Sequence, residues 1–437
     1  MPFYIVTGVF TLVNNGVHLA TNFTRLLAVV HIFKKRAFWL TAIFCCFYLF
    51  SSAQYFAVDS NRKNVSIPFR LIRNMVVIKM QINNKGPFNF VLDTGVGLMI
   101  MTDPTMVDSI NLSQKRTIKI SGLGEDGDYE AFVTTPLKLE IPGLSSHGVS
   151  SAILKKDYFS LSSYVGMPIH GLIGWDFFNN LAVKITFSDS TLTVCRPKDL
   201  KGTKKSQKIP ITIEDKKPYL ETMVTFPDGR SGKNKLVIDL GAGHPLSLEN
   251  LQKTNGLPKT YIRANLGVAL NGPISGYISR INEIELGKYK VKNVITSFPD
   301  IATEARSYSI ARDGNLGIGI LKKFNVIFDY SNNALYLKPN QTYNEPFEHD
   351  MSGIEYYSTG DNLDHLVVSR VEPNSPADEI GLQRNDEIVS INFKPVAKMS
   401  VEEVDNLLKS KTDRSILLEV YHDKRYDRVI LTLRRRI

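Results

Sequence analysis

Cysteine is scarce in this sequence, which limits both its cross-links and its chemistry. Of three cysteines, Cys45 and Cys46 lie in an apolar segment near the N-terminus, and Cys195 stands alone in the rest of the chain. If that segment is removed, no intramolecular disulfide can form, so the fold must be stabilised by its hydrophobic core. The neighbours Val194 and Arg196 offer no base that would activate a thiol nucleophile.

The chain also lacks the spacing of a metal site and the charge pattern of a nucleic-acid binder. Its histidines follow no spacing typical of zinc ligands, and no metal or other cofactor is expected. The net charge is +10, but the basic residues form no run with interleaved aromatic residues, so no nucleic-acid partner is predicted. No helical pattern follows Gly122-x-Gly124, which excludes a phosphate-binding loop there.

An apolar run near the N-terminus predicts export. Lys34-Lys35-Arg36 precede the run at 37–50, and small residues follow it up to Ala53. This is the order of a secretory signal peptide cleaved after Ala53, and the run is short for a membrane span. We therefore expect a secreted or periplasmic protein. An uncleaved anchor, with the protein facing away from the cytoplasm, is the alternative; a mis-assigned start codon would explain the unusual length before Lys34.

The rest of the chain contains a diverged internal duplication. Residues 171–194 and 314–337 align without a gap at an offset of 143. Each segment predicts an apolar-apolar-Gly turn, a short helix and a hairpin with a polar turn. Upstream, an apolar strand runs twice into Asp-x-Gly, at Asp93-Thr94-Gly95 and at Asp239-Leu240-Gly241. Each unit is thus expected to place one carboxylate at the end of a strand.

Two similar units that bring two carboxylates to one point are suited to general acid–base chemistry. Carboxyl groups a few ångströms apart cannot both ionise, so they share one proton. The charged group can take a proton from water while the protonated group polarises a carbonyl. Asp93 and Asp239 are therefore candidates for hydrolysing a peptide bond without a metal or a covalent intermediate.

Residues 65–338 resemble the retropepsin-like aspartic protease family in its two-lobed bacterial form. The resemblance is carried by the two Asp-x-Gly loops together with the turns Ile173-Gly174 and Leu316-Gly317. It implies a mainly β fold of two duplicated, closed-barrel lobes. It also implies that Asp93 and Asp239 form the catalytic dyad of an aspartic-type endopeptidase acting on protein or peptide substrates.

The resemblance further assigns support of the two loops to one threonine and four glycines: Thr94, Gly95, Gly241, Gly174 and Gly317. The threonine would hydrogen-bond across the interface between the lobes. The second loop departs from the family, because Leu240 stands where Thr or Ser is usual and leucine cannot donate a hydrogen bond. Half of the symmetric brace is therefore missing. This departure keeps open an alternative in which the lobes hold a peptide without cleaving it.

Each lobe also carries a Gly-rich stretch between its Asp-x-Gly loop and its Gly turn. These stretches lie at 121–129 and 271–277, each followed by an alternating strand. Glycine at a hairpin tip allows positive φ and close backbone approach, as a flap over a cleft requires. The flap candidates are Gly122, Gly124 and Gly276, and ordinary hairpin turns are the alternative.

The C-terminal part resembles a PDZ domain of the bacterial protease-associated type. The resemblance is carried by residues 371–377, Gly381-Leu382 and 385–388. A helix with Ser400 as its N-cap follows. PDZ domains accept a peptide as an additional strand and hold its C-terminal carboxylate with backbone N–H groups. By resemblance, these groups belong to Ser352, Gly353 and Ile354, and a packing module is the alternative.

The sequence thus predicts an exported, mainly β endopeptidase whose PDZ domain, with one or two helices, binds C-terminal peptide tails. A catalytically inactive binding module is one alternative. A membrane-tethered scaffold, which requires the N-terminal segment to stay attached, is another. The expected parts are a signal peptide or anchor, a first lobe, a linker, a second lobe, a second linker and the PDZ domain, at 1–53, 54–197, 198–208, 209–338, 339–350 and 351–437.

Overall fold

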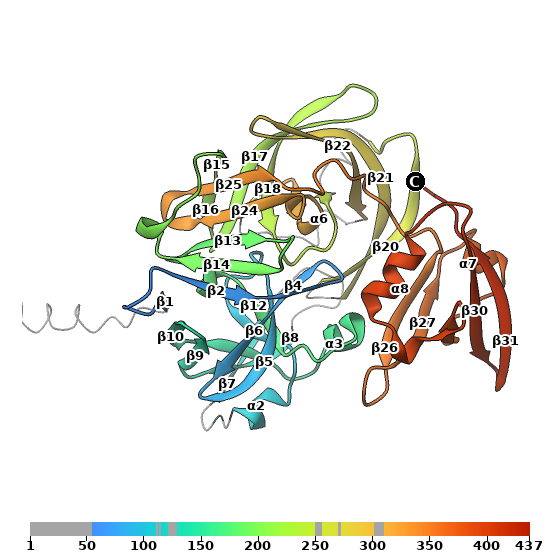
Figure 1. Ribbon diagram of the computed structural model, residues 1–437, viewed down its shortest axis with the longest axis horizontal. Helices are drawn as coiled ribbons and strands as arrows, with labels where there is room; N and C mark the ends of the chain where they lie inside the picture. Colours follow the sequence, from blue (N-terminus) through green and yellow to red (C-terminus); the bar gives the residue numbers. More distant parts are fainter. Residues whose placement is uncertain are drawn as a thin grey trace, which may run out of the picture. The chain divides into compact units, whose positions relative to one another are not determined.

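The computed structural model describes most of the chain after residue 54 (Figure 1). The described residues are 55–110, 112, 115–120, 129–249, 256–269, 272–300 and 310–437. The predicted signal peptide, with its cleavage point after Ala53, and the flap candidates Gly122 and Gly124 lie outside these ranges. No helix within the described ranges is long and apolar enough to cross a membrane. Strands predominate, which confirms the expected mainly β fold.

The first lobe is built on a sheet of 11 strands. Along β4 (Met75–Ile82), Ile78, Met80 and Ile82 are buried while Lys79 is exposed, the alternation of a sheet with one face on a core. The strands across this sheet are β1 (Phe56–Val58), β10 (Leu144–Val149), β9 (Leu137–Ile141), β4, β5 (Lys85–Leu92), β12 (Gly171–Ile173), β6 (Met99–Met101), β11 (Ser151–Leu154), β8 (Tyr129–Thr134) and β7 (Lys115–Ile120), with β3 (Arg70–Ile72) beside β4.

The second lobe is built on a sheet of eight strands that closes on itself. Closure comes from β17, which pairs with β18 on one side and with β21 on the other. The strands in order are β16 (Thr212–Glu214), β17 (Lys217–Thr225), β18 (Ser231–Asp239), β23 (Gly314–Gly317), β19 (Leu246–Leu248), β22 (Tyr289–Pro299), β21 (Gly272–Leu286) and β20 (Tyr261–Ala269).

The two lobes follow the same plan. In each, an antiparallel hairpin (β4–β5 or β17–β18) is joined in parallel by a short strand, β12 or β23. The long strand β21 of the second lobe corresponds to two strands of the first, β8 and β9. The break between β8 and β9 contains Pro136, which has no N–H to donate to a sheet. As β21 pairs with β17, so β9 pairs with β4.

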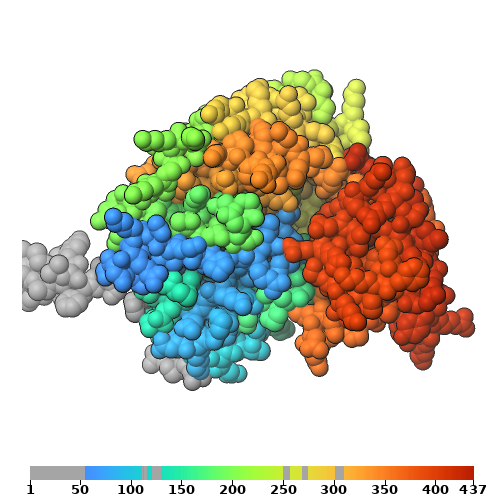
Figure 2. Space-filling view, viewed as in Figure 1, coloured from blue at the N-terminus to red at the C-terminus, as the bar shows by residue number. Residues whose placement is uncertain are grey.

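A third sheet of six strands joins the lobes. Its centre is the antiparallel pair β13–β24, where Ala182 lies opposite Asp329 and Ile185 opposite Val326. Figure 2 shows β13 and β14 (green) beside β24 and β25 (orange). Each lobe contributes three strands: β2 (Asn64–Pro68), β14 (Thr191–Cys195) and β13 (Ala182–Thr186), then β24 (Phe324–Asp329), β25 (Ala334–Pro339) and β15 (Gln207–Pro210).

One hydrophobic core continues through both lobes. It includes Phe178 of the first lobe and Phe328 of the second, whose ring centroids lie 5.2 Å apart. Burial of apolar area on this scale is the main favourable contribution to folding. Within the described residues the one cysteine, Cys195, is buried and unpaired, so no disulfide adds to this contribution there. The short helices of the lobes are α2 (Met106–Ser109), α3 (Leu161–Val165), α4 (Trp175–Phe178), η1 (Pro197–Asp199), α6 (Ile318–Leu321) and η2 (Tyr330–Asn332).

The C-terminal domain has a core of its own and a six-stranded sheet. The Ser400 side chain accepts a hydrogen bond from Glu403 N and caps α8, whose Val404 and Leu408 are buried. Asn385 has a φ of 74°, in the left-handed region that asparagine tolerates. The elements are β26 (Ile354–Thr359), β27 (His365–Val371), α7 (Pro376–Glu379), β28 (Glu387–Ile391), β29 (Lys394–Pro395), η3 (Val396–Lys398), α8 (Val401–Leu408), β30 (Ser415–His422) and β31 (Arg425–Thr432).

Candidate active site

The two Asp-x-Gly loops begin where a strand of each lobe leaves its sheet. Asp93 follows β5, and its N–H donates to Ile173 O at 2.9 Å, continuing the parallel pairing of β5 with β12. Asp239 ends β18 and lies opposite Gly317 in the parallel pairing of β18 with β23. The apolar strands therefore fix both carboxylates through main-chain pairing on a buried sheet.

The Gly turns pack directly against these loops. A Cβ atom on Gly174 would lie 2.0 Å from Asp93 O, and a Cβ atom on Gly317 would lie 1.9 Å from His244 O. Real Cβ contacts are never this short, so both turns need glycine for close backbone approach. The residue after each glycine then bonds the loop in the same way: Trp175 N donates to Val96 O at 3.1 Å, and Ile318 N donates to Ala242 O at 3.0 Å.

The duplication brings the two carboxylates face to face across two further glycines. A Cβ atom on Gly241 would lie 2.3 Å from Asp93 Oδ2. A Cβ atom on Gly95 would lie 3.0 Å from Asp239 Oδ2 and 3.0 Å from Asp93 Oδ1. A side chain at Gly241 would thus collide with the Asp93 carboxylate, and one at Gly95 would crowd both carboxylates.

Burial and the negative charge of the neighbouring carboxylate together favour one shared proton on this pair. Burial of the Asp93 carboxyl raises its pKa well above the usual range, and the Asp239 carboxylate raises it further by charge repulsion and by a hydrogen bond. The Gly95 N–H, at 2.7 Å from Asp93 Oδ1, and the more distant charge of Lys217 lower this pKa. The first two effects prevail, so the pKa of Asp93 stays raised and the pair favours holding one proton.

Hydrogen bonding distinguishes the two carboxylates. Asp239 accepts from Gly241 N at 2.9 Å and Ala242 N at 3.2 Å on Oδ1, and from Asn315 Nδ2 at 3.0 Å on Oδ2. Donors of this kind stabilise an ionised carboxylate. Asn315 was not predicted as a site residue. Its signal is a polar residue at the position that is Leu172 in the first unit, 143 residues earlier.

The brace between the loops is one-sided. Thr94 Oγ1 donates to Ile238 O at 2.6 Å and accepts from Leu240 N at 3.0 Å, so one hydroxyl bonds the main chain of the other lobe twice. Thr94 is 1% exposed. The Leu240 side chain is fully buried in the common core and makes no such bond. Apolar packing thus replaces the second half of the brace.

Two buried polar groups beside the carboxylates were not predicted as site residues. The Tyr330 ring stacks on Phe178 at a centroid distance of 5.7 Å, and its hydroxyl has no hydrogen-bond partner among the described residues. Burial raises the pKa of Tyr330 well above its usual range, and the charges of Asp239 and Asp93 add to this. His244 Nε2 is also buried without a partner in the described part, and burial lowers the pKa of this histidine.

Comparison with known families agrees with this geometry. Residues 78–177 match a family model described as aspartyl protease, and residues 367–421 match one described as PDZ domain. The chain contains an aspartyl protease domain and a C-terminal PDZ domain. The first match includes Asp93 and Gly174, whereas Asp239 lies outside it and is related to Asp93 by the duplicated topology. A search of curated proteins found no match.

One flap candidate of the protease domain is not at a hairpin tip. Gly276 lies inside β21, opposite Ala264 of β20 and Pro299 of β22. A Cβ atom there would lie 2.4 Å from Phe298 O. The expected tip position is therefore wrong, since the strand continues through this glycine. Close packing between β21 and β22 explains why glycine occupies this position.

The loop predicted to bind a peptide carboxylate in the PDZ domain has no free donor. Ser352 N and Gly353 N both donate to Asp350 Oδ2, at 3.1 and 2.5 Å, and Ile354 N donates to Ser352 Oγ at 3.0 Å. The side chain of Asp350 thus takes the place that the carboxylate of a peptide would occupy. The assignment of Ser352, Gly353 and Ile354 as carboxylate ligands is corrected accordingly.

Proposed function

We propose that this protein is an aspartic-type endopeptidase of the two-lobed retropepsin-like kind, with Asp93 and Asp239 as its dyad. The observation that carries the proposal is the meeting of the two carboxylates across Gly95 and Gly241, on two loops of the same construction. The match of residues 78–177 to aspartyl proteases supports it. Protein or peptide chains are the proposed substrates.

The proposed mechanism assigns one role to each carboxyl. Asp239, which accepts three hydrogen bonds, is the ionised base and takes a proton from water. The water oxygen bonds to the peptide carbonyl carbon, while the Asp93 proton passes to the carbonyl oxygen. In the second step Asp239 gives its proton to the amide nitrogen, one hydroxyl of the diol intermediate returns a proton to Asp93, and the C–N bond breaks to release the carboxylic acid and amine products. The dyad then again holds one proton.

The cellular setting belongs to the same proposal. Removal of residues 1–53 would release a secreted or periplasmic enzyme, and retention would leave it anchored. The segment at 121–128 and the β20–β21 hairpin are the proposed flaps, because each lies between an Asp loop and its Gly turn in the chain. N-terminal sequencing of the mature protein distinguishes cleavage after Ala53 from retention.

A second candidate function is binding of a peptide without cleavage. The buried Leu240, which leaves the brace between the loops one-sided, favours it. In that case the lobes would hold a peptide with unchanged affinity when Asp239 becomes asparagine, and no product would form at any pH.

The deciding experiment is cleavage of an unfolded protein substrate between about pH 3 and pH 8. A dyad sharing one proton gives a bell-shaped pH profile. We expect this profile for the wild type, and losses of at least 100-fold in Asp93→Asn and Asp239→Asn. Full activity in either variant contradicts the mechanism, and a folded wild type without activity at any pH supports the binding function.

A further inference from the structure

The groove of the PDZ domain lies between β26 and α8. In the described sheet, β26 pairs with β27 on one side and ends the strand order on the other. An open strand edge beside a helix is where a PDZ domain takes in a peptide as an additional strand. The neighbouring loop, which was predicted to bind a peptide carboxylate, is already occupied by the side chain of Asp350. The groove must therefore recognise a peptide by other groups.

An arginine of the protease domain enters this groove. Arg73, in the turn between β3 and β4, donates through Nε and Nη2 to the two oxygens of Asp405 on α8, both at 3.2 Å. Its Nη1 donates to Tyr356 O, on β26, at 3.3 Å. A single side chain therefore bonds both walls of the groove, and only 6% of it is exposed.

Aromatic rings complete the arginine site. The guanidinium carbon of Arg73 lies 4.3 Å from the ring centroid of Tyr356 and 4.6 Å from that of Tyr164. The Tyr356 hydroxyl donates to Asp405 Oδ1 at 2.5 Å and so orients the carboxylate. A bidentate carboxylate with flanking aromatic rings is a combination that suits the planar guanidinium and not the lysine ammonium.

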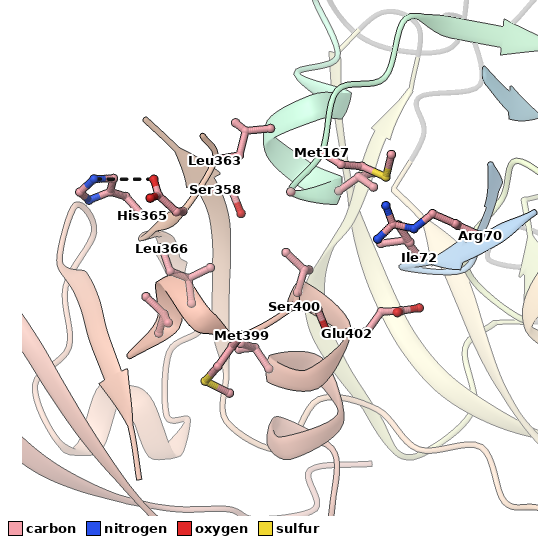
Figure 3. A pocket seen from close by; sticks show the side chains of 16 residues that line it. Arg70, Ile72, Met167, Ser358, Leu363, His365, Leu366, Met399, Ser400 and Glu402 are labelled. Atoms are coloured by element: carbon pink, nitrogen blue, oxygen red, sulfur yellow. Dashed lines mark ion pairs between the residues drawn. The ribbon is translucent and has the colours of Figure 1, made fainter. Parts of the chain in front are cut away.

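The protease domain also packs against both walls of the groove. Helix α3 packs against β26, and a Cβ atom on Gly166, just after α3, would lie 2.5 Å from Val401 of α8. The space left is a pocket of about 80 Å³, below the several hundred Å³ of typical ligand sites. Figure 3 shows Met167 and Arg70 of the first lobe facing Ser400 and Glu402 of the PDZ domain across it.

We propose that the PDZ groove is a recognition site for an arginine within a peptide segment, independent of a free C-terminus, and that Arg73 is its resident ligand. The bidentate bond to Asp405, the stacking on Tyr356 and the bond to the edge of β26 supply the recognition. An external arginine-containing segment binds by displacing Arg73. The occupied loop at Asp350 makes a terminal carboxylate unnecessary.

Displacement of Arg73 would disturb a turn that also supports the second Asp loop. The next residue, Asn74, donates through Nδ2 to Gly243 O at 2.8 Å and accepts from Lys322 Nζ at 2.9 Å. The turn that holds Arg73 in the PDZ groove thus also supports the main chain four residues after Asp239. This consequence for catalysis rests on the proposed function, whereas the binding site does not.

The test measures peptide binding by the full-length protein with fluorescence anisotropy. The probe is a fluorescein-labelled peptide of residues 69–76 with an amidated C-terminus. Arg73→Leu should bind it at least tenfold more tightly than the wild type, because the resident ligand is gone. A probe with leucine in place of its own Arg73 should bind the variant at least tenfold more weakly. A probe with a free carboxylate should bind like the amide within twofold.

Matched variants define the controls. Arg230→Leu removes an arginine that pairs with Asp228 in a surface turn and should bind the probe as the wild type does. Arg73→Leu/Asp405→Asn should lose the gained affinity. Equal affinity of wild type and Arg73→Leu, absence of binding to both, or a tenfold gain from the free carboxylate would each overturn the proposal.

A second measurement applies if Arg73→Leu fails to fold. Asp405→Asn keeps the shape of the carboxylate but weakens both bonds to Arg73. Hydrogen–deuterium exchange over residues 70–75 should then be at least tenfold faster than in the wild type. Unchanged exchange over this segment contradicts the role of Arg73 as a ligand of the groove, whether or not the protein cleaves any substrate.

Discussion

Asn315 donates a hydrogen bond to Asp239 at 3.0 Å, where the first lobe has Leu172 at the corresponding position. The duplicated fold thus carries a local asymmetry directly at the paired carboxylates. Asp239 accepts three hydrogen bonds and Asp93 accepts one from the main chain. A symmetric pair would have no preferred place for a single proton, whereas this arrangement directs it to Asp93.

Asn315→Leu makes the second lobe resemble the first and tests this asymmetry. Loss of a hydrogen bond to a charged group removes about 1.5–3 kcal/mol. Since one pH unit corresponds to about 1.4 kcal/mol, the acidic limb of the kcat/KM profile should move about one to two units to higher pH. Asn234→Leu makes the same substitution in a different strand, β18, and should leave the pH of the acidic limb unchanged. An unchanged limb in Asn315→Leu would refute the role of Asn315.

Asp93→Asn should stabilise the protein at neutral pH. The pKa of Asp93 is raised, chiefly by burial, so the folded state prefers the protonated form. Its stabilising contribution is therefore complete below the unfolded pKa, near 4, and is lost as pH rises through the folded pKa. Asparagine avoids this loss. In urea denaturation at pH 7, the free energy of unfolding of Asp93→Asn should exceed that of the wild type by about 1.4 kcal/mol per unit of pKa shift. The two proteins should be equally stable near pH 4. Equal stabilities at pH 7 would contradict the raised pKa.

Thr94→Val should destabilise the contact between the lobes. The variant keeps the volume but leaves Ile238 O and Leu240 N without their buried partner. An unsatisfied buried group costs about 1–3 kcal/mol, and urea denaturation should show a decrease of this size in the free energy of unfolding. Thr94→Ser retains the hydroxyl and serves as the control. If both variants unfold alike, the hydroxyl has no bracing role.

Gly317→Ala should disrupt the second Asp loop. The new methyl carbon would lie 1.9 Å from His244 O, so the backbone must move. Because this is overpacking against rigid main chain, we expect the free energy of unfolding to fall by about 3 kcal/mol or more. Gly232→Ala is the control, because its nearest neighbour would be Asn234 Nδ2 at 4.0 Å. Thermal unfolding of both variants tests this, and a Gly317→Ala protein as stable as the control would rule out the close packing.

Short sequence patterns were sufficient to predict those features whose physical cause lies in neighbouring residues. The equal spacing of the two duplicated segments predicted the paired Gly turns, which make the same main-chain bond at Val96 and Ala242. Ser400 was predicted as a cap because a helix leaves its first N–H groups unpaired. In each case neighbouring residues contain the whole explanation.

The sequence by itself determined a mainly β chain, the duplication, and the two loops in which Asp-x-Gly follows an apolar strand. These depend on alternation, glycine and repeat spacing, which are properties of short segments. Only the tertiary structure decided that Asn315 bonds Asp239, that Asp350 fills the loop before β26, and that Arg73 reaches Asp405, 332 residues away. Such contacts depend on how strands from distant parts of the chain pair and pack, and no local pattern encodes that geometry.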